Sequence, residues 1–514
     1  MSWLERFFDG HVKGYKEPQP EAYRDLRLHA SLSDKLVELY RHSDGTTDLV
    51  IKKFTVEGVA CALLMFEGLY STATLAEMTM RTLMQGNQKK PDAQGLLAWV
   101  RGEGLIATDQ KEIYTYGELW QFAMSGFALL LIDGIEQAVV IGAQGFSYRS
   151  ISQPDSEVNL RGSREGFVEA LRVNMSMIRR RMKTPYLQFE PFNVGTKSHT
   201  DGMLVYLSDT VSPKLLRGIR HSLTKINMEV VLDTGYLQPF LEGRPLSLFS
   251  GSGVTERPDV LSAKLAEGRV GLLLDGTPFA LIVPYLFVEN FQSMDDYSHR
   301  PFYASMMRLL KYFAFLMTVL LPGGYVAVVT FHPELLPKAL LFTIADSVVS
   351  TPFPMVLEAF IIHLLYEVMR EAGVRLPRAI GHAVSIIGGL VIGDAAVRAG
   401  IVGTPMVMIV ALTAISSFVV PGLYEPVTVL RFAFILIGGA LGLFGITLAF
   451  GALLVNLCAL EAQGIPVMAP ASPFRLYSLR DLFVRWSWKT LQRRHLEVQD
   501  LPGSHLNREV GGSE

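Results

Sequence analysis

Residues 432–460 read FAFILIGGALGLFGITLAFGALLVNLCAL, a run of 29 residues without one charged side chain. Two further uncharged runs, 312–331 and 399–424, precede it. A bilayer core is about 30 Å thick, and a helix needs roughly 20 apolar residues to cross it. Only helices and closed barrels satisfy their backbone hydrogen bonds in lipid. Because the first 300 residues read as a soluble protein, the sequence predicts an α/β soluble module followed by a polytopic α-helical membrane domain.

The composition excludes several classes of protein. A net charge of −2 over 514 residues argues against nucleic-acid binding, which needs a strongly basic face. The two cysteines, Cys61 and Cys458, are too few for a disulfide framework or a cysteine metal cluster, and we expect no metal and no cofactor. The start, MSWLERFFDGHVKGYKEP, lacks the apolar segment of a cleaved signal. We therefore expect an internal helix to direct insertion and the soluble module to stay on the cytoplasmic side.

The soluble half contains an internal repeat. GFALLLIDGIEQAVVIGA at 126–143 and RVGLLLDGTPFALIVP at 269–284 are apolar runs, each broken by an Asp-Gly pair at Asp133 and Asp275. Asp-Gly between β-rich runs is a strong hairpin signal. Each arm is too short to cross a membrane, so we interpret the arms as buried strands and the two aspartates as turn formers rather than catalytic acids.

Matching segments precede the two hairpins. VACALLMFEG at 59–68 and DGMLVYLSDT at 201–210 are strand patterns, and each leads into an amphipathic helix pattern. Ser71 and Ser212 stand at the expected N-caps of these helices. Because order as well as pattern repeats, the sequence predicts two similar α/β subdomains.

The predicted organisation follows from these boundaries. It comprises an N-terminal extension (1–30), a first α/β subdomain (31–150), a helical linker (151–184), a second α/β subdomain (185–300), a membrane domain (301–474), and a basic interfacial tail with a disordered C-terminus (475–514). The linker carries Arg179-Arg180-Arg181, which we interpret as a solvated helix face or an intersubunit salt-bridge site, with anionic lipid or an acidic partner as the alternative. Within the tail, Trp486 and Trp488 lie among basic residues, which is typical of a segment at a membrane surface.

No catalytic residue set can be assembled from the sequence. The chain has no P-loop, no GxSxG, no HExxH and no glycine fingerprint between a strand and a helix. We therefore predict that the protein is not an enzyme and that the soluble module serves assembly or signal reading.

The apolar half predicts several membrane segments. A first span over 309–331 has Arg308 and Lys311 at its start, which places that end in the cytoplasm. If the module and the tail share one side, the number of crossings must be even. Either the run 432–460 is a hairpin broken at GGALGLFG, or one segment is re-entrant. The remaining predicted features are an apolar region at 339–369 broken by prolines at 350–354, a basic loop at 370–378, and spans at 380–397 and 404–423.

Ionisable side chains at membrane depth are costly and are therefore functional candidates. His363 and Glu367 lie one helical turn apart, so we expect them to pair, whereas Glu358 faces away and needs a partner elsewhere. AVSIIGGLVIG at 383–393 suits either close helix packing or the wall of a pore gated by dewetting. The intramembrane ionisable candidates are Glu358, His363, Glu367 and His382, with Asp346 and Asp394 at similar depth. The pore and gate candidates are Ser385, Ile387, Gly388, Gly389, Val391, Ile392 and Asp394.

Several long stretches resemble one known family. These are REAGVRLPRAIGHAVSIIGGLVIGDAAVRAGIV at 370–402, MVMIVALTAISSFVVP at 406–421, SREGFVEALRVNMSMIRRRMK at 163–183, FQSMDDY at 291–297 and TFHPELLP at 330–337. Over about residues 40–475 the chain resembles the A subunit of the GerA-type spore germination receptors, a family that includes the paralogue class SpoVAF.

The resemblance implies a protein of the spore inner membrane. It implies a B subunit similar to amino-acid transporters that reads the nutrient, a lipoprotein C subunit, and a homo-oligomer such as a pentamer that forms a nutrient-gated cation channel. The chain departs from the family pattern at His382 and Asp394, where Gln is usual, and at His363, where many members carry Glu. These changes favour either a more cation-attracting, pH-sensitive pore or neutral change within a packed helix.

Three alternatives remain at this point. A SpoVAF-like accessory channel would amplify germination without reading a nutrient itself. A secondary transporter would carry inverted repeats in the membrane half, and none is evident in the sequence. A non-conducting scaffold for the germination complex would leave the intramembrane acids without a role.

Overall fold

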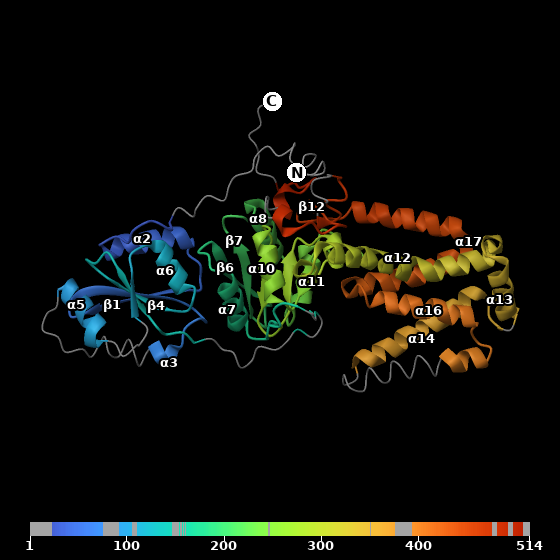
Figure 1. The fold of residues 1–514 in the computed structure, drawn as a ribbon, viewed down its shortest axis with the longest axis horizontal. Helices are drawn as coiled ribbons and strands as arrows, with labels where there is room; N and C mark the ends of the chain where they lie inside the picture. Colours follow the sequence, from blue (N-terminus) through green and yellow to red (C-terminus); the bar gives the residue numbers. More distant parts are fainter. Residues whose placement is uncertain are drawn as a thin grey trace, which may run out of the picture.

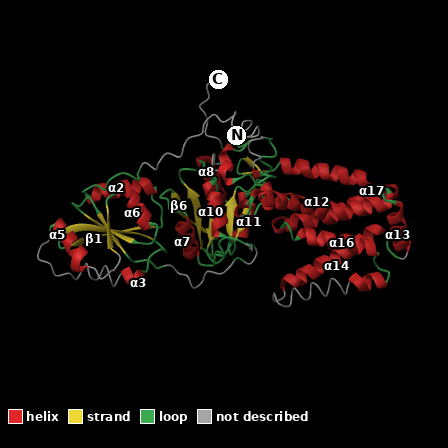
Figure 2. Ribbon diagram, viewed as in Figure 1, coloured by secondary structure: helices red, strands yellow, loops and turns green. Residues whose placement is uncertain are grey.

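The computed structural model describes residues 23–75, 92–104, 110–145, 154, 157, 159, 161–244, 247–349, 351–375, 393–474, 481–491 and 497–506. Three parts follow one another along the long axis of the molecule: a first α/β subdomain, a second α/β subdomain, and a helical region (Figure 1). Strands occur in the first two parts, and the third is built from helices (Figure 2). The predicted fold class, two similar α/β subdomains followed by a helical region, is confirmed.

The first subdomain is a five-stranded antiparallel sheet in the order β1-β2-β4-β5-β3. Alternate residues of the central strands point to opposite faces. Leu64 and Leu131 pack under α2 and α6, whereas Leu63 and Leu130 pack under α3 and α5. The elements are α2 (Leu32–Ser43), β1 (Leu49–Val56), β2 (Val59–Phe66), α3 (Thr72–Leu75), α5 (Ala93–Trp99) with a π-helical turn at Val100–Gly104, β3 (Gln110–Ile113), α6 (Tyr116–Ala123), β4 (Ala128–Ile132) and β5 (Ala138–Ile141).

The second subdomain repeats this topology, with the strand order β6-β7-β9-β10-β8. Helices α7 and α10 cover one face of its sheet, and α8 and α9 lie on the other. The elements are α7 (Leu171–Arg181), β6 (Leu187–Val194), β7 (Thr200–Leu207), α8 (Pro213–Thr224), a 3₁₀ turn (Thr234–Tyr236), α9 (Gln238–Leu241), β8 (Gly253–Thr255), α10 (Pro258–Ala266), β9 (Val270–Leu274) and β10 (Ala280–Val283).

The two Asp-Gly turns do more than reverse the chain. The Asp133 carboxylate accepts a hydrogen bond from the backbone N–H of Leu32, the first residue of α2, at 2.7 Å. In the second subdomain, Asp275 accepts from Leu171, the first residue of α7, at 3.0 Å. The amides at a helix start have no partner within the helix, and a negative charge is favourable there. Each hairpin therefore caps the helix that packs beside it.

The predicted serine cap at Ser212 is correct in position but not in chemistry. Ser212 is the N-cap of α8, yet its hydroxyl donates to the Leu506 carbonyl oxygen at 3.4 Å and accepts no hydrogen bond from a helix amide. Pro213 at the first helical position fixes the backbone for the helix start instead. Ser71 directly precedes α3, whose described residues end at Leu75.

The interpretation of Arg179-Arg180-Arg181 as a solvated face is wrong. Arg179 is fully buried and makes a bidentate ion pair with Asp48 of the first subdomain, at 2.7 and 2.8 Å. Its guanidinium also lies between the rings of Phe66 and Phe189. Arg180 and Arg181 both bind Glu165. Burial alone would raise the pKa of Glu165, but these two guanidinium groups outweigh burial and lower it.

Among the described residues of the helical region, two helices are long and apolar enough to cross a membrane, Pro301–Phe331 and Pro421–Cys458. A shorter apolar helix spans Thr404–Ser417. The predicted proline break at 350–354 separates α13 from α14. The described helices are α11 (Met294–Ser298), which follows a 3₁₀ turn at Phe287–Phe291, α12 (Pro301–Phe331), α13 (Lys338–Val349), which follows a short turn at Pro333–Leu335, α14 (Met355–Arg375), α16 (Thr404–Ser417) and α17 (Tyr424–Cys458), which follows a turn at Pro421–Leu423.

The predicted basic loop at 370–378 is wrong over its first part, because α14 continues to Arg375. Ion pairs one turn apart, Glu367 with Arg370 and Glu371 with Arg375, support the helix there. Residues 376–378 and most of the predicted span 380–397 lie outside the described residues.

The last apolar run is a helical hairpin, one of the two arrangements predicted for it. Gly442, inside GGALGLFG, has φ 64° and ψ −154°, a conformation that only glycine adopts readily. It lies against Phe331, at the end of α12 far from the module. The two arms, 424–441 and 443–458, run antiparallel, because Val427 and Leu457 near their outer ends belong to one apolar cluster with Phe287 of the module.

Residues 481–491 and 497–506 fold onto the second subdomain, so the prediction of disorder is wrong over 497–506, whereas residues 507–514 lie outside the described residues. Leu482, Val498, Leu501 and Leu506 are buried in the same core as Leu272 of β9. A backbone hydrogen bond also holds this segment, because the Val498 N–H donates to the Glu267 carbonyl oxygen at 2.8 Å. The described elements here are β11 (Glu461–Ala462), β12 (Ile465–Pro466), α18 (Trp488–Leu491) and a 3₁₀ turn (Val498–Asp500).

Replacing Gly442 with Ala should destabilise the hairpin by roughly 1–3 kcal/mol, because an L-residue is strained in this conformation and its Cβ would lie 3.2 Å from the Phe331 ring. Thermal unfolding of the detergent-solubilised chain measures the effect. Gly451→Ala is the matched control, because a Cβ there meets nothing within 4 Å on the same helical element. Equal melting temperatures for the two variants would contradict the hairpin.

Arg179→Met should cost roughly 3–5 kcal/mol, because removing one partner leaves a buried carboxylate at Asp48 without its countercharge. Arg172→Met is the control, since Arg172 pairs with Glu67 across the same subdomain boundary but is 80% exposed, and such pairs contribute about 1 kcal/mol or less. Denaturant unfolding of both variants tests this, and similar losses would show that burial of Arg179 does not matter.

Candidate functional site at the junction of module and helices

Residues 291–301 lead the chain out of the second subdomain and into α12. Ser293 and Asp296 form a capping box at the start of α11. The Ser293 backbone N–H donates to Asp296 Oδ2 at 3.3 Å, and the Ser293 hydroxyl donates to Asp296 Oδ1 at 3.0 Å. Pro301 occupies the first turn of α12, where its missing N–H is not needed. The FQSMDDY stretch therefore fixes the angle at which α12 leaves the module.

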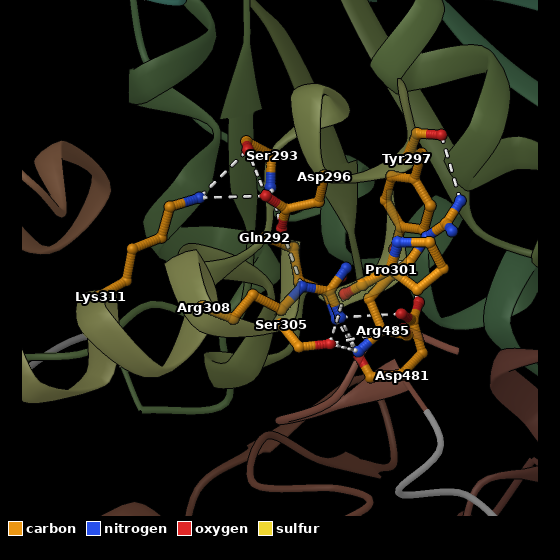
Figure 3. A network of polar contacts seen from close by, with 10 residues as sticks. All are labelled: Gln292, Ser293, Asp296, Tyr297, Pro301, Ser305, Arg308, Lys311, Asp481 and Arg485. Atoms are coloured by element: carbon orange, nitrogen blue, oxygen red, sulfur yellow. Dashed lines mark hydrogen bonds and ion pairs between the residues drawn. The ribbon is translucent and has the colours of Figure 1, made fainter. Parts of the chain in front are cut away.

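Arg308 of α12 is the centre of a polar network (Figure 3). Its side chain is fully buried. Nε donates to Asp296 Oδ2 at 2.8 Å, and Nη1 donates to the Asp481 carbonyl oxygen at 2.6 Å and to Asp481 Oδ1 at 2.8 Å. One guanidinium thus joins the module, the first helix and the C-terminal segment.

Neighbouring side chains complete the network. Tyr297 donates its hydroxyl to Asp481 Oδ2 at 2.7 Å, and burial followed by the Asp481 charge raises the pKa of Tyr297 well above its usual value, so the hydroxyl stays protonated. Arg485 donates from its backbone N–H to Ser305 Oγ at 3.0 Å, and from its guanidinium to the Tyr297 carbonyl at 3.1 Å. The C-terminal segment is therefore held along the first turns of α12.

A cavity of about 630 Å³ lies beside this network. Its walls come from the second subdomain, from Lys311 of α12 and from residues 419–426 at the start of α17. Glu289 and Glu157 are among the lining acids. Burial would raise the pKa of Glu289, but Arg269 and Lys264 outweigh burial and lower it, whereas burial raises the pKa of Glu157. The cavity is lined by both charged and apolar side chains, and it is shared between the module and the helices.

Tyr424 links the cavity to the interior of the helical region. It lines the cavity, donates its hydroxyl to Glu367 of α14, and carries the Arg370 guanidinium 3.5 Å above its ring centroid. Glu367 in turn accepts from Arg431 of α17 at 2.8 Å, and Arg431 is fully buried. A buried ion pair therefore starts at the cavity wall.

Comparison with known proteins identifies the family. Residues 35–496 match the family described as Bacillus/Clostridium GerA spore germination protein. The chain belongs to the GerA family. Among its relatives, spore germination protein KA of Bacillus subtilis (strain 168) is 37% identical over 93% of this chain and 88% of its own length.

Other relatives cover the chain to the same extent. Spore germination protein GerLA of Bacillus cereus is 34% identical over 92% of this chain and 97% of its own length. Uncharacterized membrane protein YfkQ of Bacillus subtilis (strain 168) is 36% identical over 92% of each chain. The crystal structure of the N-terminal domain of the A subunit of the Bacillus megaterium spore germinant receptor GerK3 covers 51% of this chain and 97% of that domain, with 28% identity and a TM-score of 0.40.

The ionisable residues predicted to lie at membrane depth in this GerA-family chain occupy separate places in the described structure. Glu358 is buried and accepts a hydrogen bond from the Gly403 N–H, which precedes α16, at 2.7 Å. Glu358 therefore binds the start of a neighbouring helix and not a residue of its own helix. Asp394 is exposed and pairs with Arg398, and Asp346 is also exposed. His382 and the pore candidates Ser385, Ile387, Gly388, Gly389, Val391 and Ile392 lie outside the described residues.

The expected pairing of His363 with Glu367 is wrong. His363 Nδ1 lies 2.8 Å from the Ala359 carbonyl of its own helix, and Glu367 binds Arg431 and Arg370 instead. An arginine on a neighbouring helix offers a full charge, whereas a neutral imidazole one turn away offers only a hydrogen bond.

Sequence reasoning missed Arg431, Asp296, Tyr297 and Asp481. Arg431 sits directly before the run 432–460, where a charged residue marks only the end of an apolar stretch. The FQSMDDY motif carried the signal for Asp296 and Tyr297, because its acids precede the basic start of α12. Among the described residues, no group of three or more His, Cys, Asp or Glu side chains could hold a metal ion.

Asp481→Ala should lower the stability of the full chain by roughly 1–3 kcal/mol, because Arg308 and Tyr297 each lose an acceptor. It should also release residues 481–491 to limited proteolysis. Glu229→Ala is the control, since Glu229 pairs with Lys197 on the surface with both side chains about two-thirds exposed. A tail that stays protected in the Asp481 variant would show that the network does not hold it.

Proposed function

We propose that this chain is a subunit of a nutrient-responsive spore germination receptor, and that copies of it form a gated cation channel in the spore inner membrane. The α/β module lies on the cytoplasmic side in this proposal. Nutrient reading belongs to a transporter-like B subunit, and a lipoprotein C subunit completes the receptor.

Charge placement supports the membrane location and the orientation. The two long apolar helices begin beside the module, where Arg308, Lys311 and Arg370 gather near the helix ends. Basic residues favour the cytoplasmic ends of membrane helices. The relative YfkQ is named as a membrane protein, which agrees with this placement.

Buried polar groups support an ion-conducting role over a passive anchor. Arg431, Glu367 and Glu358 face the interior of the helical region, and ionisable groups at that depth are costly unless they serve function or pair with one another. Conduction itself is assigned to the glycine-rich segment at 380–397, with Val391 as the proposed gate and Asp394 near its end.

The observation that carries the proposal is the double contact of Tyr424. The same side chain lines the junction cavity and binds the Glu367–Arg431 pair. A change in the module that moves residues 419–426 would therefore move one partner of a buried ion pair between α14 and α17. Buried pairs tolerate little displacement, because separating the charges leaves both desolvated, so the contact can convert a shift in the module into a rearrangement of helices.

Ion flux in vegetative cells tests the proposal. The chain is expressed alone and together with B and C subunits, and flux is followed after nutrient addition. Nutrient-triggered flux that requires all three subunits supports the receptor channel. Flux from this chain alone would favour an accessory channel of the SpoVAF kind, and no flux from an assembled complex would favour a non-conducting scaffold.

Tyr424→Phe tests the coupling within the same assay. The variant keeps the ring under Arg370 but removes the hydroxyl that donates to Glu367, so nutrient-triggered flux should change while assembly is retained. Tyr40→Phe is the matched control, because Tyr40 is half exposed on α2 of the first subdomain. Equal flux from the two variants would rule out Tyr424 as the coupling residue.

A further inference from the structure

An exposed apolar patch surrounds the start of α12 at the junction. It is formed by two segments far apart in the sequence, and we call it the collar: Phe302, Tyr303, Met306, Phe483, Val484 and Trp488. Phe302 is 92% exposed and Trp488 is 56% exposed. Soluble surfaces rarely gather large apolar side chains in this way without a partner.

The collar is rigid, because the second segment is fixed to the first. Arg485, between Val484 and Trp488 in the sequence, is buried and bonded to Ser305 of α12. The Phe483 ring centroid lies 5.0 Å from that of Tyr312, and the Trp488 indole N–H donates to the Tyr297 carbonyl at 3.1 Å. The exposed side chains therefore hold set positions relative to α12.

The collar continues an apolar face of α12. Leu309, Leu310 and Phe313 are each about half exposed on the same helix, and they lie within or beside the run proposed to enter the membrane. At 1.5 Å of rise per residue, Phe302 lies about 10 Å below Leu309 along the helix axis. The headgroup layer on each side of a bilayer is about 5–8 Å thick, so Met306, about 4.5 Å from Leu309, lies within this layer and Phe302 lies at its outer edge.

We propose that the collar binds the headgroup layer of the cytoplasmic leaflet, with anionic lipid as its partner. The inference rests on the proposed membrane location of the helical region. Aromatic side chains with a polar edge favour this layer, and the neighbouring exposed cations Arg300 and Lys489 match anionic headgroups. A second protein as the occupant is less well matched, since protein interfaces are depleted in lysine at their core.

Lipid binding at the collar would set the position of the module as well as the depth of α12 in the membrane. Trp488 and Arg485 both bind the Tyr297 carbonyl, and the Tyr297 hydroxyl binds Asp481, the partner of Arg308. Lipid contact at the collar is therefore one contact away from the junction network. Seating the collar sets the position of the module against the membrane.

Fluorescence of the full chain in vesicles tests the proposal. The wild type, Trp488→Phe and Trp99→Phe are reconstituted in phosphatidylcholine vesicles with and without phosphatidylglycerol, and emission is quenched by lipids brominated either near the headgroup or deep in the acyl chain. We expect lipids brominated near the headgroup to quench part of the wild-type tryptophan emission. Trp488→Phe should lose this quenched part of the emission. Trp99→Phe should keep it, because Trp99 lies in the first subdomain. Arg300→Gln with Lys489→Gln should abolish the gain in this quenching given by phosphatidylglycerol.

Two results would overturn the proposal. A Trp488 component quenched by aqueous iodide and not by brominated lipid would place the collar in water. A component whose quenching by lipid disappears as the protein-to-lipid ratio rises would place a protein neighbour on it. Neither result depends on ion flux. A chain that inserts into the membrane without conducting ions still tests lipid binding at the collar. A conducting chain with Trp488 in water would overturn the lipid-binding proposal and leave the proposed channel function intact.

Discussion

The Arg308 guanidinium is the constraint on which the arrangement of the molecule depends. It is buried where three parts of the chain meet, and it binds Asp296 from the module side and Asp481 from the C-terminal segment. A buried arginine with one partner missing destabilises a protein strongly, so each of the three parts is held in place by the others. If α12 tilted against the module, the Arg308 guanidinium would become exposed to solvent or would lose its carboxylate partners.

The two α/β subdomains show how one architecture is adapted to two positions. Both use the same strand order and the same aspartate cap from a hairpin to a helix. The first subdomain meets the second through Arg179 and Asp48. The second also receives Leu482, Val498, Leu501 and Leu506 on one face of its sheet. The chain therefore leaves the second subdomain through α12 and returns to it after α17. The helical region is attached to the module at its first and its last residues.

Local patterns in the sequence were sufficient for much of this fold. The Asp-Gly turns predicted both hairpins, and the glycine-rich centre of the last apolar run contained the residue, Gly442, at which the helix reverses. The partners of charged residues could not be predicted in this way. Arg179 and Arg485 look like surface residues by composition, and only the folded chain brings Asp48 or Tyr297 to them. The C-terminal residues 497–506 carry few apolar side chains, and these are buried because the rest of the core is already present. Residues 382–392, which include most of the proposed pore candidates, lie outside the described structure and stay a prediction.

The Arg308 network couples the C-terminal segment to the start of α12, so that the two open together. Native-state hydrogen exchange of the full chain in lipid nanodiscs measures this directly. We predict that the hydrogen-bonded amides of residues 304–308 and of Arg485, Thr490 and Leu491 open with the same free energy, because loss of the shared network frees both segments together. Fast exchange of Arg485, Thr490 and Leu491 while 304–308 stays protected would contradict this prediction.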